Sequence, residues 1–394
     1  MTLAIPVQAG TDLVDRAARA VPVLREHALW QEDHRELHPE TLAALREAGI
    51  LRMRVPQQYG GHAADATTML RVITELAQGD GSAAWLAAVW SMCNWLTGLF
   101  PDAVQDEVFA DPDGGVCGVL SPSAMATPAD GGLVISGEWH FISGARHSGW
   151  QLVLAMAPTP DGASLWPVMA LVPLRDLTVI DDWHTSGLRG TGSVTTAARE
   201  VFVPAERVLP MVAILQGQYA SARNAGTPLF RAPMMATGCA SFTGTAIGLA
   251  KAALEDYRTR LDNKITYTEY ASRREAPVTH RQLAEATLLI DEAEFHATRL
   301  AAQIDERAAT GQEWTPLDRV AARAALGRVF QLAKNAVDLL VTGSGGSSIY
   351  ASVAIQRIQR DIQSLNLHAL MHPDTNQELY GRLLAGLAPN TMYL

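Results

Sequence analysis

Two runs of the sequence combine hydroxyl, glycine and aromatic residues in a way that could hold a ligand. The run from Asp182 to Ser193 reads DWHTSGLRGTGS, so glycines bracket Thr191 on both sides. Such a loop can bring backbone N–H groups and hydroxyls close to an anionic or carbonyl-rich ligand. A polar connection between two strands fits the same residues equally well.

The second run, residues 137–150, reads GEWHFISGARHSGW and contains Ser143 at the end of a predicted strand. Aromatic rings with a hydroxyl donor beside them suit a flat heteroaromatic cofactor. Ordinary aromatic packing of a buried strand is the alternative interpretation.

Other motifs that carry chemistry are missing from the sequence. It contains no GxGxxG, Walker, GxSxG or HExxH pattern, so classical nicotinamide binding is not supported. The three cysteines, at 93, 117 and 239, form no CxxC pair. We therefore expect no metal site and no disulfide framework, but free thiols in a reducing compartment.

Charge and hydropathy exclude some classes of function. The 394 residues include 31 basic and 41 acidic side chains, a net charge of −10, which argues against a nucleic-acid binder. The N-terminus lacks the pattern of a signal peptide. Residues 83–100 are apolar but contain Ser91, Asn94 and Thr97, so they predict a core helix rather than a membrane span. We expect a soluble, cytoplasmic protein.

Hydrophobic periodicity divides the chain into three zones. Apolar residues recur at helical spacing up to about residue 110, alternate in strands from about 115 to 210, and return to helical spacing from about 228 to 384. This order predicts an α+β fold: an N-terminal helical domain (1–112), a middle antiparallel β-barrel-like domain (113–212) and a C-terminal four-helix bundle (213–394).

These features together resemble the acyl-CoA dehydrogenase superfamily over nearly the whole chain, and in particular its flavin-dependent two-component monooxygenase branch. The residues that carry the resemblance are Trp139–Gly144 (Trp-x-Phe-x-Ser-Gly), Gly187–Ser193 with Val201–Pro204, Asn94-Trp95, Gly343-x-Gly-Gly, Arg360-Asp361, His368, and Gly381-Arg382 with Gly386.

The resemblance implies roles for individual residues. Ser143 is expected near flavin N5, Ser121 on the pyrimidine side, and Thr191 and Ser193 beside the ribityl or phosphate part. It also implies a homotetramer in which a neighbouring subunit supplies phosphate contacts, from Arg273 or Arg274. The full set of expected cofactor-binding residues is Ser121, Trp139, Phe141, Ser143, Arg189, Thr191, Ser193 and Arg274.

One position separates the two activities known for this fold. A dehydrogenase needs a carboxylate base, and the family's glutamate follows the Arg-Asp pair. Here residues 360–373 contain no glutamate but offer His368, with His372 as a competitor. In the monooxygenases a histidine at this place stabilises the C4a-(hydro)peroxyflavin, and an imidazole pKa near working pH suits that role. We therefore expect His368 and Ser143 to be the catalytic residues.

A tryptophan-rich helix is expected beside the substrate. Trp90 and Asn94 share a helical face and Trp95 flanks it, so these three could contact a large aromatic molecule. Simple core packing of the helix is equally compatible with each of them.

The sequence therefore predicts the oxygenase component of a two-component monooxygenase. It would take reduced FMN, or FAD, from a separate NAD(P)H-dependent reductase and use O2 to hydroxylate an aromatic or heteroaromatic molecule, such as a polyketide-type natural product. The alternatives are a dehydrogenase acting on an acyl thioester and a non-catalytic member of the fold.

Overall fold

The N-terminal part consists of five helices. In this computed structural model, which describes residues 7–394, Asp65 and Asp80 begin α3 and α4 by accepting hydrogen bonds from Thr68 N and Ala83 N. Every residue of α4 is buried, as the sequence predicted for a core helix. The helices are α1 (Val7–His34), α2 (Pro39–Glu47), α3 (Ala66–Gly79), α4 (Gly81–Thr97) and α5 (Asp102–Val108). Residues 1–6, part of the stretch inspected for a signal peptide, lie outside the described residues.

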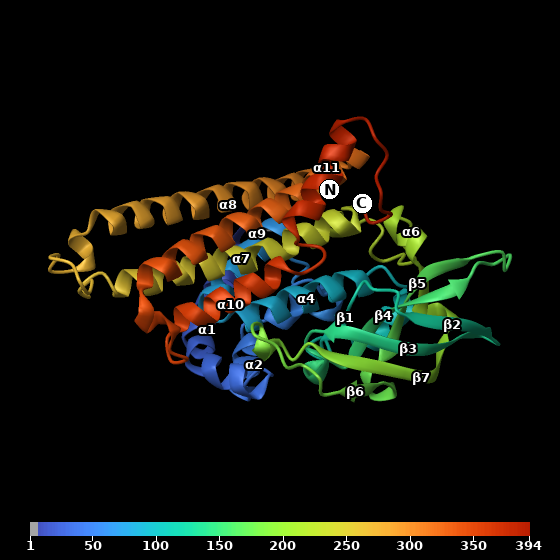
Figure 1. The fold of residues 1–394 in the computed structure, drawn as a ribbon. Helices are drawn as coiled ribbons and strands as arrows, with labels where there is room; N and C mark the ends of the chain where they lie inside the picture. The colour runs from blue at the N-terminus through green and yellow to red at the C-terminus, as the bar shows by residue number, and fades with distance from the viewer. Residues whose placement is uncertain (1–6) are drawn as a thin grey trace.

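An eight-stranded sheet follows the helices (Figure 1). Its order is β6-β7-β3-β2-β4-β5-β8, and β1 pairs with β4. The sheet is open, and the pairs β1–β4 and β2–β4 are parallel. The strands are β1 (Val116–Gly118), β2 (Ala124–Ala129), β3 (Gly132–Ile142), β4 (Trp150–Pro158), β5 (Leu165–Pro173), β6 (Thr178–Ile180), β7 (Val194–Pro204) and β8 (Val208–Pro210). The α+β class is confirmed, whereas the expected antiparallel, barrel-like middle domain is corrected to an open, mixed sheet.

Strand β3 is irregular where it approaches Ser143. The alternation of the sequence predicts that Trp139 and Phe141 lie on one face of the strand. Instead, the register with β7 shifts between Trp139 and Ile142, and Phe141 has a φ of +65°. This bulge buries Trp139 completely and leaves Phe141 66% exposed. The expectation of one continuous face is therefore wrong.

The C-terminal part is helical again. Helices α7, α8, α9 and α10 pack on one another as the expected bundle, and α3 of the N-terminal part packs against α7 (Figure 1). A capping box between Thr315 and Asp318 begins α9. The helices are α6 (Met211–Leu215), α7 (Met234–Thr259), α8 (Pro277–Thr310), α9 (Pro316–Ser344), α10 (Ala354–Asn366) and α11 (Pro373–Leu384).

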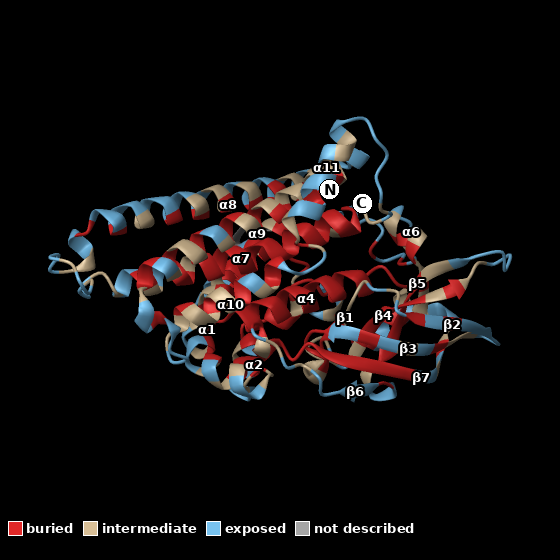
Figure 2. Cartoon of the chain, in the orientation of Figure 1, coloured by how far each residue is buried: buried red, intermediate tan, exposed pale blue. Residues whose placement is uncertain are grey.

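Helix α4 joins the helical and β parts of the molecule. It contacts α3, α7 and α10 on the helical side and β1 and the turn Arg189–Thr191 on the β side. Figure 2 shows buried residues concentrated along α4, α7 and the inner strands. The two boundaries between the three expected domains stay predictions, although the chain changes from helix to strand between Val108 and Val116.

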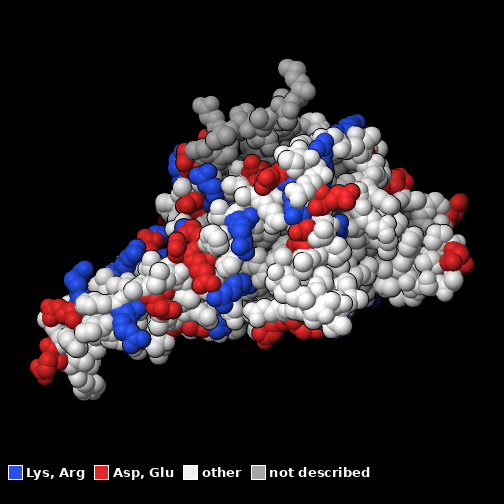
Figure 3. All heavy atoms as spheres, turned by 90° about the horizontal axis from the view of Figure 1, so that it is seen from above, with Lys and Arg blue, Asp and Glu red and all other residues white. Residues whose placement is uncertain are grey.

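Charged side chains are spread over the surface. On the face drawn in Figure 3, basic and acidic groups are interspersed along the helical end of the molecule. Among the helices of residues 7–394, none combines the length and the apolar character needed to cross a bilayer.

Candidate active site

Three hydroxyl groups form a buried chain at the junction of β3 and β7. The Oγ atoms of Ser143 and Ser193 are 2.7 Å apart, and Ser193 Oγ is 2.7 Å from Thr191 Oγ1. Thr191 Oγ1 in turn donates to the carbonyl of Leu188 at 2.7 Å. The two runs that stood out in the sequence therefore meet through their hydroxyls, 50 positions apart in the chain.

The backbone around the three hydroxyls is fixed by the left-handed conformation of Leu188 and by contact with α10. Leu188 has a left-handed conformation, with a φ of +52°, which an ordinary side chain disfavours. Its N–H donates to the Asp361 carboxylate at 2.6 Å, and Gly144 N donates to Thr191 O at 3.1 Å. The loop between β6 and β7 is thus held against both β3 and α10.

Trp85 of α4 links the hydroxyl chain to His368. Its indole Nε1–H donates to Ser143 Oγ at 3.0 Å. Its ring meets the imidazole of His368 edge-on, with centroids 5.4 Å apart, and packs on Phe242 at 4.9 Å. Ser143 and His368, both expected to be catalytic, therefore both contact the same tryptophan.

His368 lies in the turn after α10, and its tautomer is set by the backbone. Leu370 N donates to His368 Nδ1 at 3.1 Å, so in the neutral ring the proton sits on Nε2. Within residues 7–394, no residue forms a hydrogen bond with Nε2 of His368. The imidazole is thus a hydrogen-bond donor with a free Nε2–H.

The pKa of His368 is shifted from its ordinary value. His368 is an exposed residue, yet the protein around its ring lowers the pKa of His368 to about 4 by desolvation. The direction of this shift favours the neutral ring. The role expected of His368 from a pKa near working pH stays a prediction.

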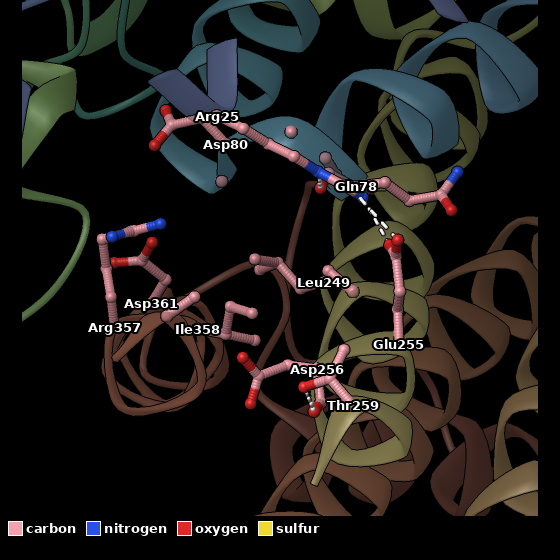
Figure 4. A pocket seen from close by; sticks show the side chains of 15 residues that line it. Arg25, Gln78, Asp80, Leu249, Glu255, Asp256, Thr259, Arg357, Ile358 and Asp361 are labelled. Atoms are coloured by element: carbon pink, nitrogen blue, oxygen red, sulfur yellow. Dashed lines mark hydrogen bonds and ion pairs between the residues drawn. The ribbon is translucent and has the colours of Figure 1, made fainter. Parts of the chain in front are cut away.

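Asp361 is the second titratable group at this junction. Burial, and then the nearby carboxylate of Asp80, raise the pKa of Asp361 to about 7. Both acids line a cavity of about 250 Å³ between α1, α3, α7 and α10 (Figure 4). Across the same cavity Arg25 pairs with Glu255. This cavity adjoins the site through Asp361 but does not include Ser143 or His368.

The three residues expected to contact the substrate lie in the core. Trp90 and Trp95 are completely buried, and Asn94 is 2% exposed. Their N–H groups are bonded to Ser148 Oγ, Leu229 O and Leu51 O respectively. The structure gives these side chains a packing role and does not bring them to His368, so substrate contact by them stays an untested prediction.

The remaining expected cofactor residues fall into two groups. Ser121 and Phe141 are exposed and available to a ligand. Trp139 is in the core of the sheet, with its Nε1–H bonded to Leu154 O. Arg189 donates to the carbonyls of Glu32 and Thr185. Arg274 pairs with Asp262 in the connection between α7 and α8, a segment that lies far from the sheet in Figure 1. Trp139 and Arg189 thus support the site rather than face it.

The sequence analysis missed Trp85, Phe242 and Asp361 as members of the site. Trp85, Trp90 and Trp95 are each five positions apart, a rotation of about 140° per step, so they lie on different helical faces. A substrate-facing surface that contains Trp90 and Asn94 therefore does not include Trp85. The Arg360-Asp361 pair was noticed, but its contact with Leu188 spans 173 positions and leaves no local signal.

Comparison with known proteins identifies the family of the chain. The acyl-CoA dehydrogenase N-terminal domain matches residues 12–107, and the acyl-CoA dehydrogenase C-terminal domain matches residues 240–373. The FADH(2)-dependent resorcinol hydroxylase oxygenase component of Rhizobium sp. is 30% identical, over 97% of this chain and 96% of that protein.

Solved structures give the same result. The 3-HSA hydroxylase of Rhodococcus sp. RHA1 superposes with a TM-score of 0.92 at 26% identity, over 97% of this chain and 99% of the other. XiaF of Streptomyces sp., in complex with FADH2 and glycerol, gives 0.90 at 28%, over 98% and 97%. The chain therefore belongs to the acyl-CoA dehydrogenase superfamily and, within it, to the flavin-dependent monooxygenases.

Proposed function

We propose that this chain is the oxygenase component of a two-component monooxygenase that hydroxylates an aromatic or heteroaromatic small molecule with reduced flavin and O2. The observation that carries the proposal is His368, a neutral imidazole with a free Nε2–H that shares Trp85 with Ser143. Relatives named as hydroxylases and oxygenase components support it.

The acids near His368 do not offer the base that a dehydrogenase needs. Asp361 is buried and occupied by Leu188 N–H. Glu378 lies on α11, exposed, beside the amide of Asn390. Neither contacts Trp85 or Ser143, so oxidation of an acyl thioester is not favoured.

The residues present fit a reduced flavin. Ser143 has an oxygen lone pair that no protein donor uses, His368 presents an N–H, and Phe141 offers an exposed ring. When bound, reduced flavin supplies the electrons that activate O2. We expect reduced FMN or FAD from a separate NAD(P)H-dependent reductase, and a polyketide-type molecule is one suitable substrate.

Mixing the purified chain anaerobically with reduced FMN or FAD, and then with O2, tests this function. A transient absorbance band of an oxygenated flavin, formed on the protein and absent with flavin alone, is expected. Tightly bound oxidised flavin together with dye-linked oxidation of acyl-CoA would instead establish a dehydrogenase. Absence of flavin binding would leave a non-catalytic member of the fold.

His368→Ala tests the assigned catalytic role. The variant should fold normally but release hydrogen peroxide instead of hydroxylated product, because a donor at the oxygen-reacting position is lost. We expect product formed per reduced flavin to fall by about a hundredfold or more, the lower end of a general acid–base contribution. His372→Ala is the matched control. Equal coupling in His368→Ala and wild type would remove the role from His368.

A further inference from the structure

The hydroxyl chain described above has only one possible direction. It contains three oxygen–oxygen contacts of 2.7 Å: Ser143 to Ser193, Ser193 to Thr191, and Thr191 to the carbonyl oxygen of Leu188. Oxygens this close need a proton between them. The three hydroxyls supply three protons and the carbonyl supplies none.

Counting from the carbonyl end fixes each donor. Thr191 must donate to Leu188 O, since a carbonyl cannot donate. Ser193 must then donate to Thr191, and Ser143 must donate to Ser193. The Leu188 carbonyl also accepts from Thr191 N and from Trp183 Nε1, both at 3.1 Å, so this end is a crowded acceptor.

Trp85 completes the arrangement at the other end. Its Nε1–H donates to Ser143 Oγ and takes one of the two lone pairs of that oxygen. Ser143 is left with one free lone pair and no free proton. Ser143 is 6% exposed, Ser193 5% and Thr191 1%. We take Ser143, the hydroxyl at the end of the chain away from the Leu188 carbonyl, as the one that meets the ligand.

We infer that this polarised chain makes the site select reduced over oxidised flavin. Two chemical facts connect the chain to flavin: N5 of the reduced ring carries a hydrogen, and N5 of the oxidised ring is an acceptor. A Ser143 that can only accept matches the first and opposes the second. The inference rests on the proposed function and on the expected position of Ser143 near N5.

The cost of the opposite arrangement comes from the same counting. To donate to an oxidised ring, Ser143 must withdraw its proton from Ser193. The contact is restored only if Ser193 turns toward Ser143, which then leaves Ser193 and Thr191 facing each other without a proton. One buried hydrogen bond is therefore lost in either case. The hydroxyl chain makes Ser193 and Thr191 determinants of redox-state specificity, with no contact to the ring required of either residue.

Ser193→Ala tests the inference by removing the acceptor of the Ser143 proton. The dissociation constants of oxidised FMN and of dithionite-reduced FMN are measured anaerobically, by titration calorimetry, on the whole chain. In the wild type we expect reduced FMN to bind more tightly. In Ser193→Ala the ratio of the two constants should shift toward oxidised FMN by about tenfold, the equivalent of about one hydrogen bond.

Thr191→Val provides an independent variant of nearly equal volume. Without the threonine hydroxyl, Ser193 can donate only to Ser143, so the Ser143 proton is again released and the ratio should shift in the same direction. Trp85→Phe removes a hydrogen bond from the same Ser143 oxygen but leaves the chain direction unchanged. It should weaken binding of both redox forms without the shift in their ratio.

Ser148→Ala is the matched control for loss of a tryptophan-bonded serine. Ser148 accepts from Trp90 Nε1 at 3.0 Å and donates to Gly144 O at 2.9 Å, outside the hydroxyl chain. In Ser148→Ala the ratio of the dissociation constants of oxidised and reduced FMN should equal that of the wild type. Binding of both redox forms with a ratio unchanged in Ser193→Ala and Thr191→Val overturns the inference alone. Binding of neither form to the wild type overturns the proposed function as well.

Discussion

At the scale of single residues, the site depends on groups whose protonation is set by their surroundings. Crowding by protein lowers the pKa of His368, whereas burial beside Asp80 raises that of Asp361. The two pKa shifts run in opposite directions, but each disfavours the charged form of its group.

Asp361→Asn tests the effect of the raised pKa on stability. A carboxyl that titrates near 4 when unfolded and at about 7 when folded favours the folded state below pH 4, and this contribution is lost as pH rises through 7. Asparagine keeps an acceptor for Leu188 N–H without that penalty. The free energy of unfolding of the variant should therefore exceed that of the wild type by a margin that grows between pH 5 and 8, to the order of 2–3 kcal/mol.

Urea unfolding at several pH values measures this margin. Asp181→Asn is the control of opposite sign, because a hydrogen bond from Arg35 lowers the pKa of the Asp181 carboxyl. The free energy of unfolding of Asp181→Asn should not rise above that of the wild type as pH rises. A margin for Asp361→Asn that is independent of pH would show that the Asp361 carboxyl titrates normally in the folded chain.

At the scale of elements, the loop between β6 and β7 is positioned by close contact with α10. A Cβ added at Gly187 would overlap the carbonyl oxygen of Arg360 and lie 2.6 Å from Ser364 Oγ. Arg360 also donates to Ser186 O at 2.6 Å. The loop that carries Thr191 and the helix that leads to His368 therefore form one unit.

Gly187→Ala should separate the loop from α10. Because the overlap involves backbone, we expect a loss of about 1–3 kcal/mol in the free energy of unfolding and weaker flavin binding. Gly226→Ala is the control, since a Cβ there meets nothing within 4 Å. Thermal unfolding and flavin titration of both variants check this; equal behaviour would mean that the loop moves freely relative to α10.

At the scale of the whole molecule, one long helix exposes apolar side chains. Leu288 and Phe295 of α8 are 63% and 61% exposed and lie seven positions apart, on one face. The connection between α7 and α8, which contains Arg274, lies at the end of the bundle remote from the sheet (Figure 1). The contact expected between Arg274 and flavin phosphate therefore needs a neighbouring subunit, as in the expected homotetramer.

Replacing both Leu288 and Phe295 with aspartate should dissociate the assembly, because charges cannot be buried unpaired in an apolar interface. Sedimentation velocity is expected to show a tetramer for the wild type and smaller species for the double variant. Phe202→Asp, at a position that is 50% exposed on β7, should leave the sedimentation coefficient unchanged. A monomeric wild type would refute the tetramer.

Much of the fold follows from the sequence because it depends on local periodicity. The long helices α7, α8 and α9 begin and end within a few residues of the ranges 237–260, 280–310 and 317–342 that carry helical spacing. Strand β3 is the informative failure. Its bulge depends on pairing with β7, some 60 positions away, so alternation alone misassigned the face of Phe141.

The sequence by itself determined which residues were expected at the site. These are Ser143, Thr191, Ser193 and His368, identified by residue type, by order in the chain and by resemblance. The tertiary structure alone decided how they act. The direction of the hydroxyl chain, the contacts of Trp85 with both Ser143 and His368, and the lowered pKa of His368 all depend on distances between segments far apart in the chain. In the sequence the three hydroxyls predicted a set of ligand contacts. In the structure the carbonyl of Leu188 accepts from Thr191, and the proton of each hydroxyl is therefore directed away from the ligand.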